Sequence, residues 1–185
     1  KCLLENGPIG AISFADVHLD DEENELPMGE VGAVYFESAA RFRYHGDEAK
    51  TRESYSREGW ATFGDMGYLD ADGYLYLTDR RSHMIISGGV NIYPQEAENI
   101  LINHPDVFDV AVIGVPDPEF GEAVKALVQL HSGREPGEDV AENLLDYCHQ
   151  RLSKYKCPRS VAFVAELPRL PSGKLLKREL QARYR

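Results

Sequence analysis

The chain has 185 residues, of which 43% are hydrophobic, so it can bury the core of one compact domain or of two small ones. Its 20 basic and 31 acidic side chains give a formal charge of −11 at pH 7, which argues against a nucleic acid or an anionic membrane as its main partner. No apolar run approaches the ~18 residues that a membrane-spanning helix needs, so we expect no transmembrane segment.

The first part of the chain is rich in predicted strands. It starts with Lys1 rather than Met and shows no signal peptide, so we expect that the beginning of a longer protein is missing. Strands are predicted in AISFADVHL (11–19) and GAVYFES (32–38). A hairpin is predicted in GYLDADGYLYLTD (67–79), because Gly73 can adopt the positive φ that a tight turn requires. These segments predict a small antiparallel sheet or barrel.

After Asp79 the pattern changes to alternating helices and strands. MIISGGVNIY (84–93) predicts a second hairpin that turns at two adjacent glycines. Pro94 suits the first position of a helix over PQEAENILINH (94–104), whose apolar residues recur at i, i+3 and i+4. The charged stretch TDRRSH between the two hairpins is the expected linker between two units.

The remaining residues predict five further elements. Strands are expected over VFDVAVIGV (107–115) and AVKALVQL (123–130), followed by a helix over 138–152, where apolar residues recur every four positions. A strand over SVAFVAEL (160–167) and a short helix over KLLKRELQARY (174–184) come last. Together these elements predict a compact α+β domain.

One lysine near the end of the chain follows a shaped turn. Pro171 fixes φ and Gly173 frees it, so the Pro-Ser-Gly tripeptide predicts a tight turn that presents Lys174 at a defined place. The segment 169–185 holds six basic residues and one acidic residue, which would suit an anionic ligand. Taken alone, such a turn is more simply interpreted as a surface turn with a solvated charge.

Three features of the central stretch could contact a nucleotide. Asp65, at a strand end, could accept hydrogen bonds from the two hydroxyls of a ribose, and a turn or cap residue is the alternative. Arg80 offers a fixed fork of donors for ribose or phosphate oxygens, and a surface ion pair is the alternative. Gly88 and Gly89 would let the backbone approach a ligand closely, but a hairpin tip needs no ligand.

The order of these motifs resembles that of the adenylate-forming superfamily, which includes acyl-CoA synthetases, adenylation domains of peptide synthetases and beetle luciferases. GDMGYLDADGYLYLTDRR resembles the family segment that carries an aspartate and an arginine, and SGGVNIYPQEAE resembles the glycine loop and helix start that follow. PSGKLLKREL resembles the C-terminal catalytic-lysine motif. ENELPMGEVGAVYF resembles the segment before the aspartate, so the resemblance covers essentially the whole chain.

The resemblance implies a role for each of these residues. Asp65 would bind the ribose hydroxyls of ATP, and Arg80 would support the ribose and the phosphates. Lys174 would bridge the substrate carboxylate and the α-phosphate while the acyl-adenylate forms, which is an electrostatic role. The pantetheine arm of CoA would pass along the glycine hairpin, beside Ser87, Gly88 and Gly89.

The implied reaction has two halves. A carboxylic acid, which we expect to be a fatty acid, reacts with MgATP to give acyl-AMP and pyrophosphate, and the thiol of CoA then displaces AMP. A small C-terminal domain would rotate between the halves. At the hinge, where family members usually carry Asp or Lys, this chain has Ser82, and we assign no role to the neighbouring His83. IYPQEAE resembles the acyl-CoA ligase subgroup, so CoA is the preferred acceptor.

Other motifs of the family are not found in this sequence. It contains no phosphate-binding Ser/Thr/Gly-rich loop, no core aromatic motif and no threonine-glutamate magnesium motif. We therefore expect 1–79 to be the distal, β-rich part of a large N-terminal domain, and 80–185 to be the complete, mobile α+β C-terminal domain. The missing rest of the large domain would supply most of the Mg²⁺ ligands, so this chain alone is expected to be inactive.

Two alternative functions remain open. An adenylation domain that loads a carrier protein would carry the same motifs, and a non-catalytic module could use the fold for nucleotide binding. The presence of Asp65, Arg80 and Lys174 argues against the second alternative. The three cysteines are too few and too scattered for a disulfide framework, so we expect a reducing, cytoplasmic location.

Overall fold

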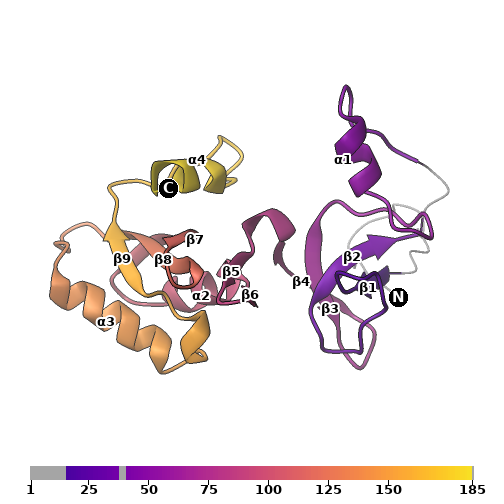
Figure 1. Cartoon of the computed structure of the whole chain (residues 1–185). Coiled ribbons are helices and arrows are strands. Elements are labelled where there is room, and N and C mark those ends of the chain that lie inside the picture. Colours follow the sequence, from indigo (N-terminus) through magenta and orange to yellow (C-terminus); the bar gives the residue numbers. More distant parts are fainter. Residues whose placement is uncertain (1–15, 38–40, 185) are drawn as a thin grey trace. The chain divides into compact units, whose positions relative to one another are not determined.

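The computed structural model describes residues 16–37 and 41–184 (Figure 1). Contacts between Cα atoms divide the chain into two compact units, and the division falls between Ser82 and His83. Each unit contains its own sheet. The combination of sheets and helices confirms the predicted α+β class.

The first unit is built on an antiparallel sheet of four strands. Their order in the sheet is their order in the chain: β1 (Asp16–Leu19), β2 (Gly32–Phe36), β3 (Asp65–Leu69) and β4 (Leu75–Arg80). Among the described residues the two outer strands do not pair with each other, so the sheet is open. The structure therefore confirms the antiparallel sheet that the sequence predicted.

The hairpin of β3 and β4 turns where the sequence predicted. The Asp70 carboxylate accepts hydrogen bonds from two backbone N–H groups of the turn, at 3.0 and 2.9 Å, and Gly73 has a φ of +80°. The turn sets the register near its own end, where Leu69 pairs with Leu75, and a register shift between Met66 and Gly67 then moves the pairing by one residue. This irregularity places Asp65 opposite Arg80 at the far end of the hairpin.

A short helix in the first unit was not predicted. Helix α1 (Glu48–Glu53) begins after Asp47, whose carboxylate accepts a hydrogen bond from the N–H of Lys50 at 2.9 Å. None of its six residues is buried, so the sequence carries no apolar period that could reveal it.

The second unit has a five-stranded mixed sheet. Antiparallel strands are bonded in the order β6 (Val90–Ile92), β5 (Ile85–Ser87), β8 (Gly121–Leu130) and β7 (Val107–Asp117). Strand β9 (Ser160–Phe163) pairs in parallel with β8. All five strands lie within or overlap predicted ones, and β9 ends earlier than expected.

Three helices cover the two faces of this sheet. Alternate residues of β7 point to opposite faces. Val112 packs in one apolar cluster with α2 (Pro94–Leu101) and α3 (Glu138–His149), whereas Ile113 packs in a second cluster with α4 (Lys177–Tyr184). Figure 1 accordingly shows α3 and α4 on opposite sides of the sheet. The strand is therefore buried on both faces.

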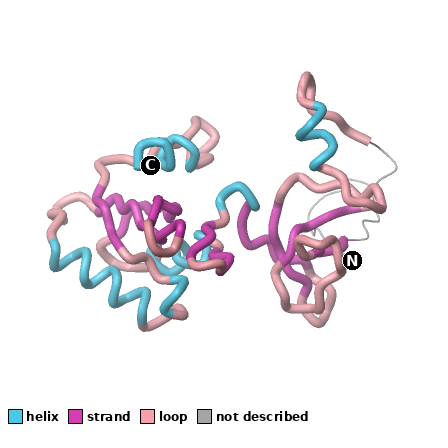
Figure 2. Tube along the Cα trace, in the orientation of Figure 1, coloured by secondary structure: helices cyan, strands magenta, loops and turns pink. Residues whose placement is uncertain are grey.

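Two helices are shorter than predicted, as the loops in Figure 2 show. Helix α3 ends at His149 rather than at 152, because Ser153 adopts an extended ψ of 138° before a short 3₁₀ turn, η2 (Lys154–Lys156). Helix α4 begins at Lys177 rather than at 174, because the carbonyl of Lys174 accepts a hydrogen bond from the N–H of Leu170 at 2.9 Å. That bond commits Lys174 to the preceding turn.

Candidate functional site

The first unit presents Asp65 and Arg80 side by side. The two residues are register partners on β3 and β4, and Arg80 Nε lies 3.1 Å from Asp65 Oδ1. The Asp65 side chain is 29% exposed and that of Arg80 is 50% exposed. An ion pair this exposed contributes little stability, but it orients the carboxylate and leaves oxygen lone pairs open to a ligand. The pair could accept a ribose diol at Asp65 and a phosphate oxygen at Arg80.

Ser82 lies in a short 3₁₀ turn, η1 (Arg81–His83), at the division between the two units. The residue before it is fixed to the first unit, because the N–H of Arg81 donates to the carbonyl of Gly64 at 2.8 Å. The Arg81 guanidinium also pairs with Asp21 Oδ1 at 2.7 Å. Ser82 itself is exposed, so its own side chain is not held in a core.

The glycine hairpin of β5 and β6 has the backbone that its sequence predicted. Gly88 and Gly89 both have positive φ, +57° and +79°, as a two-residue type I′ turn requires. The N–H of Gly88 donates to the carbonyl of Phe120 at 2.8 Å, which ties the turn to the loop between β7 and β8. Ser87 pairs with Gly121 at the start of β8. The tip is therefore held from one side.

The two glycines differ in their surroundings. A Cβ at Gly88 would lie 3.1 Å from Phe120 Cδ1, whereas a Cβ at Gly89 would meet nothing within 4 Å. Both residues are exposed. A ligand could approach the backbone of Gly89 closely, because glycine has no side chain and no neighbouring residue covers this position.

The turn before Lys174 is as tight as the sequence predicted. The N–H of Gly173 donates to the carbonyl of Leu170 at 2.8 Å, and Gly173 has a φ of +83°. Leu170 in turn donates its N–H to the carbonyl of Lys174 at 2.9 Å. The Lys174 side chain is exposed, so its ammonium is available to an anionic ligand.

An arginine that the sequence analysis did not single out anchors this turn. Arg169 donates from Nε and Nη2 to the two carboxylate oxygens of Asp109 at 2.8 and 2.7 Å, and from Nη1 to the carbonyl of Gly173 at 2.7 Å. The hydrogen bonds that Arg169 donates to the Asp109 carboxylate raise the pKa of Arg169, so it stays charged. Asp109 lies in β7, so the turn is tied to the sheet.

A buried ion pair anchors the helix that follows the turn. Lys177 Nζ lies 2.8 Å from Glu98 Oε1 of α2, and their side chains are 6% and 8% exposed. Because β7 is the last strand of its sheet, its outward N–H groups need other partners, and Val112 donates its N–H to Glu98 Oε1 at 2.7 Å. Glu98 therefore joins α2, α4 and β7.

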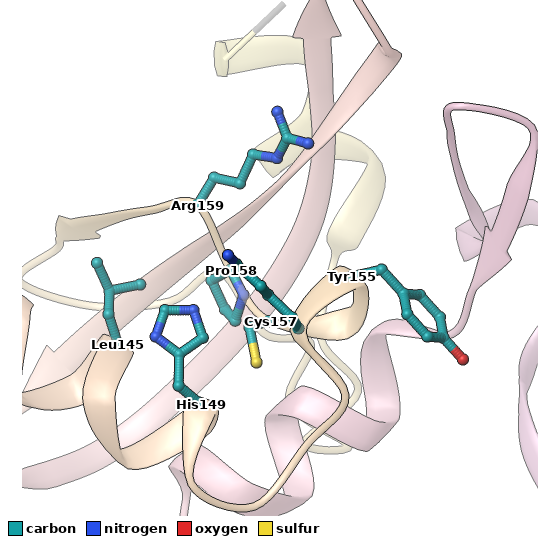
Figure 3. A pocket seen from close by; sticks show the side chains of 7 residues that line it. Leu145, His149, Tyr155, Cys157, Pro158 and Arg159 are labelled. Carbon is teal, nitrogen blue, oxygen red and sulfur yellow. The ribbon is translucent and has the colours of Figure 1, made fainter.

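A pocket of about 590 Å³ lies where α3 and η2 end (Figure 3). Its wall includes basic side chains together with apolar and aromatic ones: Leu145, His149, Lys154, Tyr155, Cys157, Pro158 and Arg159. The Arg159 guanidinium lies 3.9 Å from the centroid of the Phe120 ring, the ring that contacts Gly88. One aromatic ring thus connects the pocket to the glycine hairpin.

The predicted site residues fall in two groups. Asp65 and Arg80 belong to the first unit, whereas the glycine hairpin and Lys174 belong to the second. Across residues 16–37 and 41–184, no group of three or more His, Cys, Asp or Glu side chains could hold a metal ion. Within the same ranges, no helix has the length and apolar character to cross a membrane.

Comparison with known proteins relates this chain to AMP-binding enzymes and CoA ligases. Residues 96–174 match the family model of the AMP-binding enzyme C-terminal domain. The 2-succinylbenzoate–CoA ligase of Bacillus cereus (strain Q1) is 45% identical over 138 residues, which are 75% of this chain and 27% of that protein. The chain therefore spans about a quarter of the length of this relative.

Solved structures agree with the sequence match. The o-succinylbenzoate CoA synthetase of Bacillus subtilis, in complex with its acyl-adenylate intermediate, superposes with a TM-score of 0.78 at 37% identity, covering 92% of this chain and 34% of that one. ATP-bound MatB from Rhodopseudomonas palustris gives a TM-score of 0.80 at 31% identity, with 92% and 34% covered. Residues 96–174 are therefore an AMP-binding enzyme C-terminal domain, and most of the chain is similar to adenylate-forming CoA ligases.

Proposed function

We propose that the protein containing this chain is an AMP-forming CoA ligase, which converts a carboxylic acid and ATP to acyl-AMP and then transfers the acyl group to CoA. The observation that carries the proposal is the exposed Lys174 on a braced turn, at the end of the matched C-terminal domain. The relatives support it, since one is named a CoA ligase and another was solved with an acyl-adenylate.

In the first half-reaction the roles of the residues are electrostatic. The Lys174 ammonium would stabilise the negative charge of the substrate carboxylate and of the α-phosphate as they approach each other. Asp65 would bind the ribose hydroxyls, and Arg80 would neutralise phosphate charge while it orients Asp65. Mg²⁺ would be held mainly by residues of the large N-terminal domain outside this chain, as the resemblance implies.

In the second half-reaction the glycine hairpin would guide the acceptor. The open backbone at Gly89 could lie against the pantetheine arm, with Ser87 and Gly88 beside it. Lys154 and Arg159 of the neighbouring pocket carry positive charges that suit the phosphates of CoA. The ring of Phe120 supports both features, so this face of the second unit has the chemistry to bind CoA.

The identity of the acid is a finer question. Two of the relatives named above act on 2-succinylbenzoate according to their names, so they do not favour the fatty acid that we expected from the resemblance. We therefore propose an acyl or aryl carboxylic acid. We also propose that the residues up to Ser82 are the end of a large N-terminal domain, and that the residues after it form a mobile domain that turns about Ser82, in a cytoplasmic enzyme.

The test uses the full-length enzyme and measures each half-reaction separately. With ATP and a panel of acids, pyrophosphate release reports adenylation, and with supplied acyl-AMP and CoA, thioester formation reports transfer. Lys174→Ala should lower adenylation by roughly 100- to 1,000-fold, as removal of an oxyanion donor does, and should spare transfer. Transfer to a carrier protein but not to CoA would favour a carrier-loading adenylation domain. The absence of pyrophosphate release with every acid would contradict the proposal.

A further inference from the structure

We infer that Arg169 is a positioning residue for adenylation, and that Asp109 holds it in place. This inference rests on the proposed function, since it assigns the two residues to the delivery of Lys174. Arg169 touches no reacting group in this role. It acts through the carbonyl of Gly173, the residue directly before the lysine.

The geometry fixes the Arg169 side chain completely. Its guanidinium is a planar fork, and all three of its nitrogens are used: two bind the two oxygens of Asp109, and the third binds the carbonyl of Gly173. A bidentate pair allows one orientation of the fork, so the third donor is aimed at the turn. The side chain thereby transmits the position of Asp109 to the backbone next to Lys174.

Asp109 is itself held by the sheet. It lies in the long strand β7, at an irregularity in the pairing between Val107 and Asp109, and its Oδ1 accepts a hydrogen bond from the N–H of Val110 at 2.9 Å. Such irregularities often re-aim a side chain beside a functional site. Its side chain is only 18% exposed. The brace therefore runs from a rigid strand to a surface turn.

A lysine cannot replace Arg169 in this arrangement. An ammonium could keep the charge and pair with Asp109, but it has no planar fork that binds a carboxylate at two points and a carbonyl at a third. The turn would keep its internal hydrogen bonds and lose its tie to β7. Because a misplacement of about 1 Å can lower a rate by roughly 100-fold, the loss should appear in the half-reaction that uses Lys174.

The experiment compares Arg169→Lys and Asp109→Asn with a matched control in the full-length enzyme. Arg134 pairs with Asp106 in the same unit, so Arg134→Lys removes a guanidinium that binds a different carboxylate. For Arg169→Lys we expect kcat of adenylation to fall about 10- to 100-fold with KM for ATP nearly unchanged. Thioester formation from supplied acyl-AMP and the melting temperature should match those of Arg134→Lys.

The outcomes separate the inference from the proposed function. If the wild-type enzyme forms no acyl-AMP with any acid, the proposed function fails. If it does, and Arg169→Lys retains the adenylation rate of Arg134→Lys, the inference fails while the function stands. An equal loss in both half-reactions, accompanied by a lower melting temperature, would show a structural role and would also overturn the inference. A selective loss in adenylation supports it.

Discussion

The buried pair of Lys177 and Glu98 should contribute far more to stability than a second pair on the same helix. Lys156 Nζ lies 2.6 Å from Glu96 Oε2, and these side chains are 25% and 34% exposed, against 6% and 8% for Lys177 and Glu98. Both pairs join a lysine to a glutamate of α2, so Lys156→Met is a matched control for Lys177→Met. The two variants differ mainly in the burial of the charge left behind.

The expected cost follows from that burial. Lys177→Met leaves the Glu98 carboxylate in the interior without its counter-ion, still accepting a hydrogen bond from the N–H of Val112, and breaking a buried pair costs about 3–5 kcal/mol. Lys156→Met leaves a partly solvated carboxylate and should cost about 0–1 kcal/mol. For a unit of this size a difference of about 3 kcal/mol corresponds to roughly 12–24 °C in melting temperature.

Urea denaturation of the chain measures the difference in stability between the two variants. Unfolding of the first unit, which neither substitution touches, serves as an internal reference. The single tryptophan of the chain, Trp60, lies in the first unit, so tryptophan fluorescence follows that unit while far-ultraviolet circular dichroism also follows the second. Lys177→Met should shift the dichroism transition and leave the fluorescence transition in place. Adding Glu98→Gln, whose amide oxygen can still accept from Val112, should restore part of the loss.

Two results would contradict this reasoning. If Lys177→Met lowers the free energy of unfolding no more than Lys156→Met does, the Lys177–Glu98 pair is hydrated in solution. Burial then does not determine the energy of that pair. If the double variant with Glu98→Gln is less stable than Lys177→Met alone, an unpaired charge is not the source of the loss. In that case the lost packing of the lysine stem would be the better explanation.

Three further predictions concern the second unit. Gly88→Ala should destabilise the chain by about 1–2 kcal/mol, and by more than Gly89→Ala. Both positions have positive φ, but only a side chain at Gly88 would also meet the Phe120 ring. Urea denaturation measures the stability of both variants. Arg159→Ala should raise KM for CoA by roughly 10-fold in the transfer assay and leave pyrophosphate release unchanged, as loss of one charged hydrogen bond would. Burial raises the pKa of the Cys148 thiol to about 12, so it should resist a disulfide reagent at pH 8 until the chain unfolds, as peptide mass mapping would show. Because this pKa lies above its ordinary value of 9.0, the thiol should contribute less to stability as pH rises from 9.0 toward 12, relative to Cys148→Ala.

The sequence predicted best the features that depend on neighbouring residues. Both hairpins turn at the predicted glycines, because positive φ is a local demand that few other residues meet. Helix α2 begins at Pro94 as expected, since proline suits a first turn. Helix α1 was missed because none of its six residues is buried, so it shows no apolar period that would indicate a helix.

The sequence could not predict the anchors of the site, because their partners lie far along the chain. Arg169 and Asp109 are separated by 60 residues, and nothing in the local pattern of either residue marks the other. Their pairing depends on the register of β7 in the sheet and on the fold of the segment after β9. The basic segment 169–185 suggested an anionic ligand, yet Arg169 and Lys177 from that segment are bound by carboxylates of the protein itself.

The position of Lys174 therefore depends on tertiary contacts more than on its own turn. Helix α4 has only eight residues, of which Lys177 and Leu180 alone are buried, and a helix this short has little stability of its own. The Pro-Ser-Gly turn gives the loop its shape, but its hydrogen bonds are internal and leave the loop free to pivot as a body. Arg169 restrains it before the lysine and Lys177 restrains it after, each against a carboxylate outside the segment that the turn and α4 form. Two basic residues of the segment that the sequence offered for a ligand thus hold in place the turn that presents a third, the exposed Lys174.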